Sequence, residues 1–160
     1  MKTGVYAGSF DPVTLGHLDI IKRAEKLFDE VVLLVAENKR KKNWFSLKER
    51  KEMLEELFKG KKNIKVEVLE GLLAEYMKEK KHKFVIRGLR AISDFEYEFQ
   101  HSTINKELNS SIETVFLMTE PKYFYINSSL IKEIVSLNGN VKDFVPEIVE
   151  KKLKEKIKPD

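Results

Sequence analysis

The sequence predicts an α/β fold with a doubly wound, five-stranded parallel sheet, helices on both faces and further helices at the C-terminal end. Short apolar runs alternate along the chain with longer segments in which apolar residues recur at helical spacing. Strands that alternate with helices indicate a parallel sheet with right-handed crossover connections. The 160 residues show no repeat, linker or low-complexity tract, so we expect one domain over residues 1–160.

The expected strands are short and apolar. The run over 31–36, VVLLVA, is too short for a helix and rich in β-branched residues, which is typical of a parallel strand buried on both faces. The run over 64–69, IKVEVL, alternates apolar and polar residues instead. In chain order, the expected strands are Gly4–Gly8, Val31–Ala36, Ile64–Leu69, Phe84–Gly88 and Thr114–Met118.

The expected helices are marked by apolar spacing and by capping residues. Ser46 with Glu49, and Ser93 with Glu96, have the spacing of a capping box, in which two side chains satisfy the first backbone N–H groups of a helix. In chain order, the expected helices are His17–Phe28, Ser46–Phe58, Leu72–Lys80, Ser93–Leu108, Ser128–Leu137 and Pro146–Ile157. The resulting order, β-α-β-α-β-α-β-α-β-α-α, is that of a Rossmann-like fold.

Composition narrows the classes of function. Thirty Lys and Arg residues against 26 Asp and Glu residues give a formal net charge of +4, which suits anionic ligands. The absence of cysteine excludes disulfides and thiolate metal sites and fits a reducing compartment. No apolar run approaches the roughly 18–20 residues that cross a bilayer, and the N-terminus leaves no room for a signal peptide. We therefore expect a cytoplasmic protein without a membrane or nucleic-acid partner.

The ten residues after the first expected strand, GSFDPVTLGH (Gly8–His17), form the first candidate binding loop. Ligands of a doubly wound sheet bind beyond the carboxyl ends of its strands, where the strand order reverses. The loop is neither a G-x-G-x-x-G turn nor a P-loop. The helix that begins near Gly16 and His17 offers free backbone N–H groups and the positive end of its dipole to an anion, with Thr14 as a cap. His17 adds a directional donor; the alternative is an ordinary first-turn residue.

Basic residues follow two further strands. The loop ENKRKKNWF (Glu37–Phe45) holds four consecutive cations at 39–42, which predict either a clamp over transferring phosphates or a solvated loop. Arg87 and Arg90 lie on one tight turn after the fourth strand, where guanidinium groups suit phosphate oxygens. The alternative is a pair of arginines bonded to nearby carboxylates such as Asp94 or Glu96.

The loop after the fifth strand, EPKYFYINSSLIKE (Glu120–Glu133), carries aromatic and small polar residues. The aromatic run 123–125 predicts an apolar wall for an adenine, and Asn127 or Ser128 is expected to start a helix whose amides meet phosphates. The alternative is an aromatic core cluster followed by an ordinary N-cap.

The loop Gly8–His17 resembles the signature of the nucleotidyltransferase superfamily, whose hallmark is a (T/H)-x-G-H turn, here Thr14-Leu15-Gly16-His17. In that superfamily the histidine contacts the α-phosphate of the nucleotide, and no covalent enzyme intermediate forms. The string RGLRAISDFEYE over 87–98 further resembles the branch that transfers AMP from ATP to 4′-phosphopantetheine and releases pyrophosphate. The segment over 123–133 resembles it too, although serine is more usual where Asn127 stands. The resemblance runs from residue 8 to about 146.

The resemblance implies direct in-line attack by the acceptor phosphate on the ATP α-phosphate. His17 and Lys41 are the expected catalytic residues. Lys41 is expected to lie over the reacting phosphates, and which lysine within 39–42 takes this place stays open. Residues expected to bind the acceptor are Ser9, Lys41, Leu73 and Arg87, with Tyr6 packed near the pantetheine arm. Residues expected to bind ATP are Ser9, Phe10, His17, Gly88, Leu89, Arg90, Glu98, Tyr123, Phe124, Tyr125, Ile126, Asn127, Ser128 and Ser129.

The resemblance also implies ligands and an assembly. Mg²⁺ is expected on the ATP phosphates, since the sequence shows no His/Asp/Glu cluster with ligand spacing. The family forms hexamers, to which the helix Ser93–Leu108 could supply an interface, and coenzyme A is a candidate feedback ligand. Alternative functions are a sister adenylyltransferase for nicotinate mononucleotide, a cytidylyltransferase for an alcohol phosphate, and a non-catalytic nucleotide-binding module.

Overall fold

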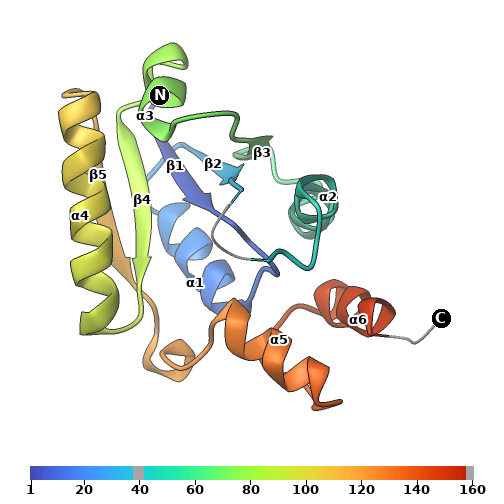
Figure 1. Cartoon of the computed structure of the whole chain (residues 1–160). Coiled ribbons are helices and arrows are strands. Elements are labelled where there is room, and N and C mark those ends of the chain that lie inside the picture. The colour runs from blue at the N-terminus through green and yellow to red at the C-terminus, as the bar shows by residue number, and fades with distance from the viewer. Residues whose placement is uncertain (38–41, 158–160) are drawn as a thin grey trace.

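The computed structural model describes residues 1–37 and 42–157, and within them it confirms the expected alternation of strands and helices. The five strands form one parallel sheet in the order β3-β2-β1-β4-β5 (Figure 1). In chain order, the elements are β1 (Thr3–Gly8), α1 (Leu15–Ala24), β2 (Glu30–Val35), α2 (Leu47–Leu57), β3 (Ile64–Val68), α3 (Leu73–Glu79), β4 (Phe84–Leu89), α4 (Ile92–Leu108), β5 (Glu113–Met118), the 3₁₀ turn Pro121–Tyr123, α5 (Ser128–Ser136) and α6 (Glu147–Lys156).

The sheet separates two apolar cores. Residues of α1, α2, α5 and α6 pack with Leu33 of β2 and Ile86 of β4 in the larger core, while Ala74 and Met77 of α3 pack with Val5 of β1 on the opposite face. Figure 1 shows α3 and α4 on one side of the sheet and α1 on the other. The central strands are therefore covered on both faces, which agrees with their continuous apolar sequence.

Helix starts follow local capping chemistry in two places and depart from it in a third. Thr14 and Ser46 are the N-caps of α1 and α2, and each takes part in a reciprocal capping box. The expected capping box of Ser93 and Glu96 is wrong, because α4 begins at Ile92 after Ala91, which makes no side-chain cap bond. The carboxylate of Asp94 instead accepts from the backbone N–H of Arg90 (3.2 Å). The side-chain bond at the start of α4 is therefore the one between Asp94 and the Arg90 backbone, and not a Ser93 cap.

The strand order reverses between β1 and β4. From β1 the chain winds outward through β2 to β3, then crosses back to place β4 on the other side of β1. At such a reversal the connections that leave the carboxyl ends of neighbouring strands diverge to opposite faces and open a binding crevice. The loop after β1, which leads into the first turn of α1 and His17, and the loop after β4, which holds Arg90, border this point.

Candidate active site

His17 lies in the first turn of α1 and is held by the residue that caps the helix. Its Nδ1 accepts a hydrogen bond from the backbone N–H of Thr14 (3.0 Å) and lies 3.0 Å from the Thr14 hydroxyl, while the Thr14 hydroxyl accepts from the His17 backbone N–H (3.4 Å). Since the backbone N–H can only donate, Nδ1 carries no proton in this arrangement. The proton of the neutral ring therefore sits on Nε2, which forms no hydrogen bond within residues 1–37 and 42–157.

Aromatic neighbours and partial burial keep the His17 ring neutral. The ring of Phe10 lies 5.2 Å from that of His17, and the ring of Tyr6 lies 6.4 Å away. Burial lowers the pKa of His17 from 6.5 to about 4, and the positive charge of Arg90 acts in the same direction. His17 is therefore a neutral hydrogen-bond donor at neutral pH rather than a cation.

The lowered pKa predicts an acid-dependent loss of stability. Between pH 6.5 and about 4, His17 is protonated in the unfolded chain but stays neutral in the folded chain, so acidification favours unfolding. Across this range His17 is expected to lower the free energy of unfolding by up to about 3 kcal/mol. Urea unfolding at a series of pH values should show a steeper loss in the wild type than in His17→Gln, whose side chain does not titrate. Equal slopes for the two proteins would contradict the prediction.

Arg87 and Glu98, predicted to hold the acceptor and ATP respectively, bind each other. Arg87 Nε and Nη2 donate to the two carboxylate oxygens of Glu98, the second bond at 2.7 Å, and Nη1 donates to the Ala7 carbonyl at the end of β1 (2.8 Å). Both side chains are largely buried. Arg87 thus keeps one N–H on each terminal nitrogen for a ligand, and the carboxylate holds the guanidinium plane at the crevice between β1 and β4.

Arg90 has the carboxylate partner that the sequence analysis left open as an alternative. Its Nε and Nη2 lie 3.1 and 3.2 Å from the Asp94 carboxylate, and Nη1 donates to the Ile126 carbonyl (3.2 Å). Arg90 therefore joins the loop after β4 to the loop after β5. The preceding Gly88 is packed closely, since a Cβ there would lie 3.0 Å from a side-chain carbon of Ile20.

The segment after β5 meets the start of α1. Tyr123 lies beside Gly16, and the Ser128 hydroxyl donates to the Pro12 carbonyl (2.8 Å). The Asn127 side chain caps α5 by accepting from the Leu130 backbone N–H (2.8 Å), so asparagine performs the capping that the sequence suggested. The N-termini of α1 and α5 are therefore joined, and two helix dipoles direct their positive ends to one region.

The remaining predicted site residues differ in how far their side chains are exposed to solvent. Ser9 and Leu73 are partly buried, while Phe124, Tyr125 and Ser129 are exposed. The side chains of Phe10, Leu89 and Ile126 are buried, which leaves their backbone atoms as the groups that could meet a nucleotide. Lys41 lies outside the described residues, and the neighbouring Lys42 is exposed.

Sequence reasoning missed the roles of two buried charged residues beneath these loops, Arg50 and Asp11. Arg50 is 1% exposed, and its Nη1 donates to the carbonyls of Ser9 (2.7 Å) and Ala36 (2.9 Å). Asp11 is also buried and forms an ion pair with Lys132 (2.9 Å). The only sequence signal is where each charge stands. Arg50 interrupts the apolar face of an expected helix, and Asp11 directly precedes Pro12 in the loop after the first strand.

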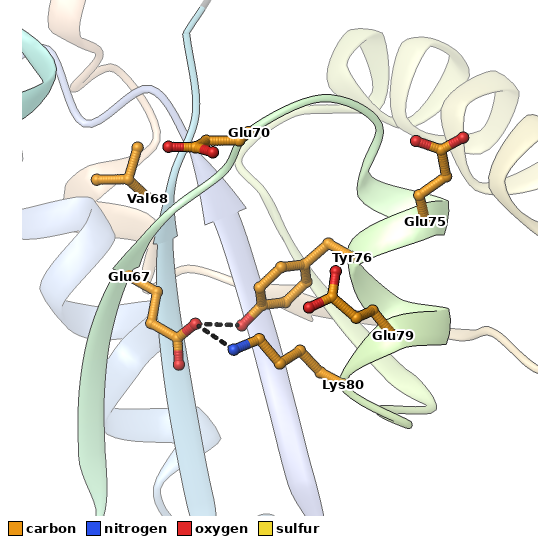
Figure 2. A pocket seen from close by; sticks show the side chains of 7 residues that line it. All are labelled: Glu67, Val68, Glu70, Glu75, Tyr76, Glu79 and Lys80. Carbon is orange, nitrogen blue, oxygen red and sulfur yellow. Dashed lines mark hydrogen bonds and ion pairs between the residues drawn. The ribbon is translucent and has the colours of Figure 1, made fainter.

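A pocket of about 260 Å³ lies apart from the predicted nucleotide residues, between β3 and α3. Figure 2 shows the Glu67 carboxylate bonded to the Tyr76 hydroxyl (3.1 Å) and paired with Lys80 (3.5 Å), with Glu70, Glu75 and Glu79 around them. Burial is the main cause that raises the pKa of Tyr76, and the negative charge of Glu67 adds to the increase. Within the described part of the chain, neither this pocket nor any other group of His, Asp and Glu side chains is arranged to hold a metal ion.

Comparison with known proteins identifies the family of the chain. A family model described as cytidylyltransferase-like matches residues 5–134. Curated relatives named phosphopantetheine adenylyltransferase include one from Caldanaerobacter subterraneus subsp. tengcongensis, 51% identical over 99% of both chains, and one from Clostridium novyi, 52% identical over 98% of both. A third, from Dictyoglomus thermophilum, is 51% identical over 99% of this chain and 98% of its own. The chain therefore belongs to the phosphopantetheine adenylyltransferase family, within the cytidylyltransferase-like nucleotidyltransferases.

Proposed function

We propose that the protein transfers AMP from ATP to 4′-phosphopantetheine, giving dephospho-coenzyme A and pyrophosphate. The identity of about one residue in two with phosphopantetheine adenylyltransferases over nearly the whole chain supports this acceptor. The observation that carries the chemistry is the neutral His17, held through Nδ1 at the N-terminus of α1, because this leaves an Nε2–H donor beside an anion-binding helix end.

In the proposed reaction, an oxygen of the acceptor phosphate forms a bond to the α-phosphorus of ATP. The bond from the α-phosphorus to the bridging oxygen breaks, and the electron pair leaves on pyrophosphate. A phosphate monoester is largely doubly ionised at neutral pH, since its second pKa is about 6, so the attack requires no strong general base. The enzyme contributes by aligning two polyanions and by neutralising charge as it develops.

The residues of the site take the following proposed roles. The His17 imidazole and the positive end of the α1 dipole bind the α-phosphate, with the Gly16 backbone amide as donor, because the amides of Leu15 and His17 are bonded to Phe144 and Thr14. Arg87 holds the acceptor phosphate, and Ser9 lies between the two. Lys41, which lies outside the described residues, covers the reacting phosphates, and Leu73 lines the pantetheine arm. The residues proposed to bind ATP are Ser9, Phe10, His17, Gly88, Leu89, Arg90, Glu98, Tyr123, Phe124, Tyr125, Ile126, Asn127, Ser128 and Ser129.

Mg²⁺ enters this proposal as part of the substrate, bound to the ATP phosphates. In residues 1–37 and 42–157 no group of three or more His, Asp and Glu side chains is arranged as a metal site. The Asp11 carboxylate, two residues from Ser9 in the loop after β1, is engaged by two backbone amides and Lys132. Phosphate oxygens and water are the ligands that Mg²⁺ commonly keeps in such enzymes.

An acceptor panel tests the proposed function. Pyrophosphate release is measured with ATP or CTP and, in turn, 4′-phosphopantetheine, nicotinate mononucleotide and a small alcohol phosphate. Turnover is expected only with ATP and 4′-phosphopantetheine. Turnover with another pair would assign a sister transferase, and tight ATP binding by calorimetry without turnover would assign a nucleotide-binding module. Coenzyme A, the proposed feedback ligand, should inhibit when it is added to the active pair.

We also propose that the protein acts in the cytoplasm as a homo-oligomer, a hexamer by family resemblance. No helix in the described residues has the length and apolar character needed to span a bilayer. α4 buries none of its residues within the chain, and several of its apolar side chains are exposed. The exposed apolar residues of α4 are Ile92, Phe95, Tyr97, Phe99, Ile104 and Leu108. Exposed apolar side chains gathered on one helix in this way typically contact a partner.

A charge on α4 is expected to break the assembly. In Ile104→Glu a side chain that is 57% exposed in the single chain becomes charged, and burying it between subunits would require its desolvation. Light scattering should show a mass several times 18.7 kDa for the wild type and a smaller species for Ile104→Glu. The control is Leu137→Glu, which changes an exposed leucine at the end of α5 and should leave the mass unchanged. A monomeric wild type would contradict the proposal.

A further inference from the structure

The carboxylate of Asp11 lies where three segments of the candidate site converge. Asp11 is 3% exposed and belongs to the loop between β1 and α1. Its oxygens accept from the backbone N–H of Trp44 (3.1 and 3.0 Å) and of Phe45 (2.9 Å), which precede α2, and Lys132 of α5 donates to it at 2.9 Å. One buried side chain therefore joins the loop after β1, the segment before α2 and helix α5.

The buried charge of Asp11 is compensated by Lys132 and by two backbone amides, which makes this junction rigid. A buried carboxylate is stable only when a counter-charge and hydrogen bonds replace the water it has lost. Lys132, whose side chain is 15% exposed, supplies the charge, and two amides supply the bonds. Movement of any one partner would leave charge or polar atoms uncompensated, so the three segments hold one another in place.

The junction borders the groups that would meet the phosphates. Asp11 is two residues from Ser9 and six from His17 on one loop, and Ser128, which donates to the Pro12 carbonyl, starts the helix that carries Lys132. None of the described contacts of Asp11 is with a group that we propose to touch substrate. Its influence on the reaction would therefore be exerted through the position of its neighbours.

We propose that Asp11 is a positioning residue of the transfer reaction, which sets the Trp44–Phe45 segment relative to His17, with Lys132 as the counter-charge that makes this possible. The inference rests on the proposed function. It predicts a loss in the chemical step with little loss of ATP affinity, because the Ser128–Pro12 bond still joins α5 to the loop after β1 when Asp11 is changed.

The chain offers its own spectroscopic reporter of the junction. Trp44 is the sole tryptophan, its backbone N–H donates to Asp11, and its side chain packs partly buried against the larger core. A change in the position of the segment would alter the exposure of the indole and hence its emission. This signal is independent of turnover, so it tests the junction even if the acceptor assay assigns a different substrate.

The test is Asp11→Asn, which keeps the size of the side chain but removes its charge and replaces one acceptor oxygen with a donor NH₂ group. We expect kcat with ATP and 4′-phosphopantetheine to fall about 10²-fold, the effect of a misplacement of about 1 Å. The KM for ATP should change much less, and Trp44 emission should shift to longer wavelength. The matched control is Glu30→Gln, another buried carboxylate paired with a lysine (Lys65, 2.6 Å), at the opposite end of its strand from the site.

A second variant separates positioning from general destabilisation. Lys132→Met alone leaves the Asp11 charge buried without its partner, whereas Asp11→Asn/Lys132→Met removes both charges. If the lysine acts through the carboxylate, kcat of the double variant should equal that of Asp11→Asn, so that the two losses are not additive. If Asp11→Asn does not fold, Lys132→Met should by itself shift Trp44 emission and lower kcat.

Three results would overturn the inference. They are an unchanged kcat in folded Asp11→Asn, an equal loss of kcat in Glu30→Gln, and Trp44 emission identical to that of the wild type. Wild-type turnover is measured first on the acceptor panel, so failure of the proposed function is recognised separately. A purely structural role would lower the melting temperature while leaving kcat per folded molecule unchanged, and that outcome also overturns the inference.

Discussion

Replacement of His17 by alanine is expected to lower kcat for AMP transfer by about 10²–10³-fold, the cost of removing one donor that stabilises transition-state charge. The neutral imidazole is positioned by the Thr14 backbone N–H before any ligand arrives, so its Nε2–H is available without rearrangement. A donor that serves mainly the developing charge should affect kcat more than the KM for ATP.

The measurement is steady-state kinetics of pyrophosphate release, with the folded state checked by circular dichroism. His82→Ala is the control, because this histidine lies beyond α3, where its ring is 6.2 Å from that of Tyr76, and has no proposed part in the site. Asparagine at position 17 offers a second comparison, since its amide donates a hydrogen bond but is shorter. Unchanged turnover in folded His17→Ala would exclude the proposed role of the imidazole.

Replacement of Arg50 by leucine is expected to destabilise the fold by about 3–5 kcal/mol, since the carbonyls that the guanidinium serves lose charged hydrogen bonds and stay buried. Its Nη1 serves Ser9 and Ala36 and its Nε serves Ser46 (3.3 Å), so the single side chain joins the end of β1, the end of β2 and the start of α2. Leucine fills part of the volume but offers no donor.

Urea unfolding followed by Trp44 fluorescence measures this loss. Lys48→Leu, on the same helix but exposed over 85% of its side chain, should change the unfolding midpoint little. Arg50→Lys should recover only part of the stability, because one ammonium group cannot match the geometry of a guanidinium that donates to three carbonyls. A wild-type midpoint in Arg50→Leu would show that the carbonyls find other partners.

The fold was predictable because its signals are local. Apolar runs of five or six residues and helical spacing between them fix the alternation of elements, and Thr14, Ser46 and Asn127 cap helices through bonds to residues three positions away. Local signals failed at Ser93, because α4 begins one residue earlier, at Ile92, so that Ser93 lies inside the first turn. The side-chain bond near this helix start is made instead by Asp94 to the Arg90 backbone N–H, which lies ahead of the helix.

The sequence by itself determined the strand and helix alternation, the capped turn that holds His17, and the motifs that the family shares. Only the tertiary structure decided which charges face one another: Arg87 with Glu98, Arg90 with Asp94, and Asp11 with Lys132, 121 positions away. Periodicity records whether a residue faces a core or solvent, but a charge acquires its partner when separate loops meet at one end of the sheet. For that reason the elements could be read from neighbouring residues, whereas the junction beneath the phosphate site could not.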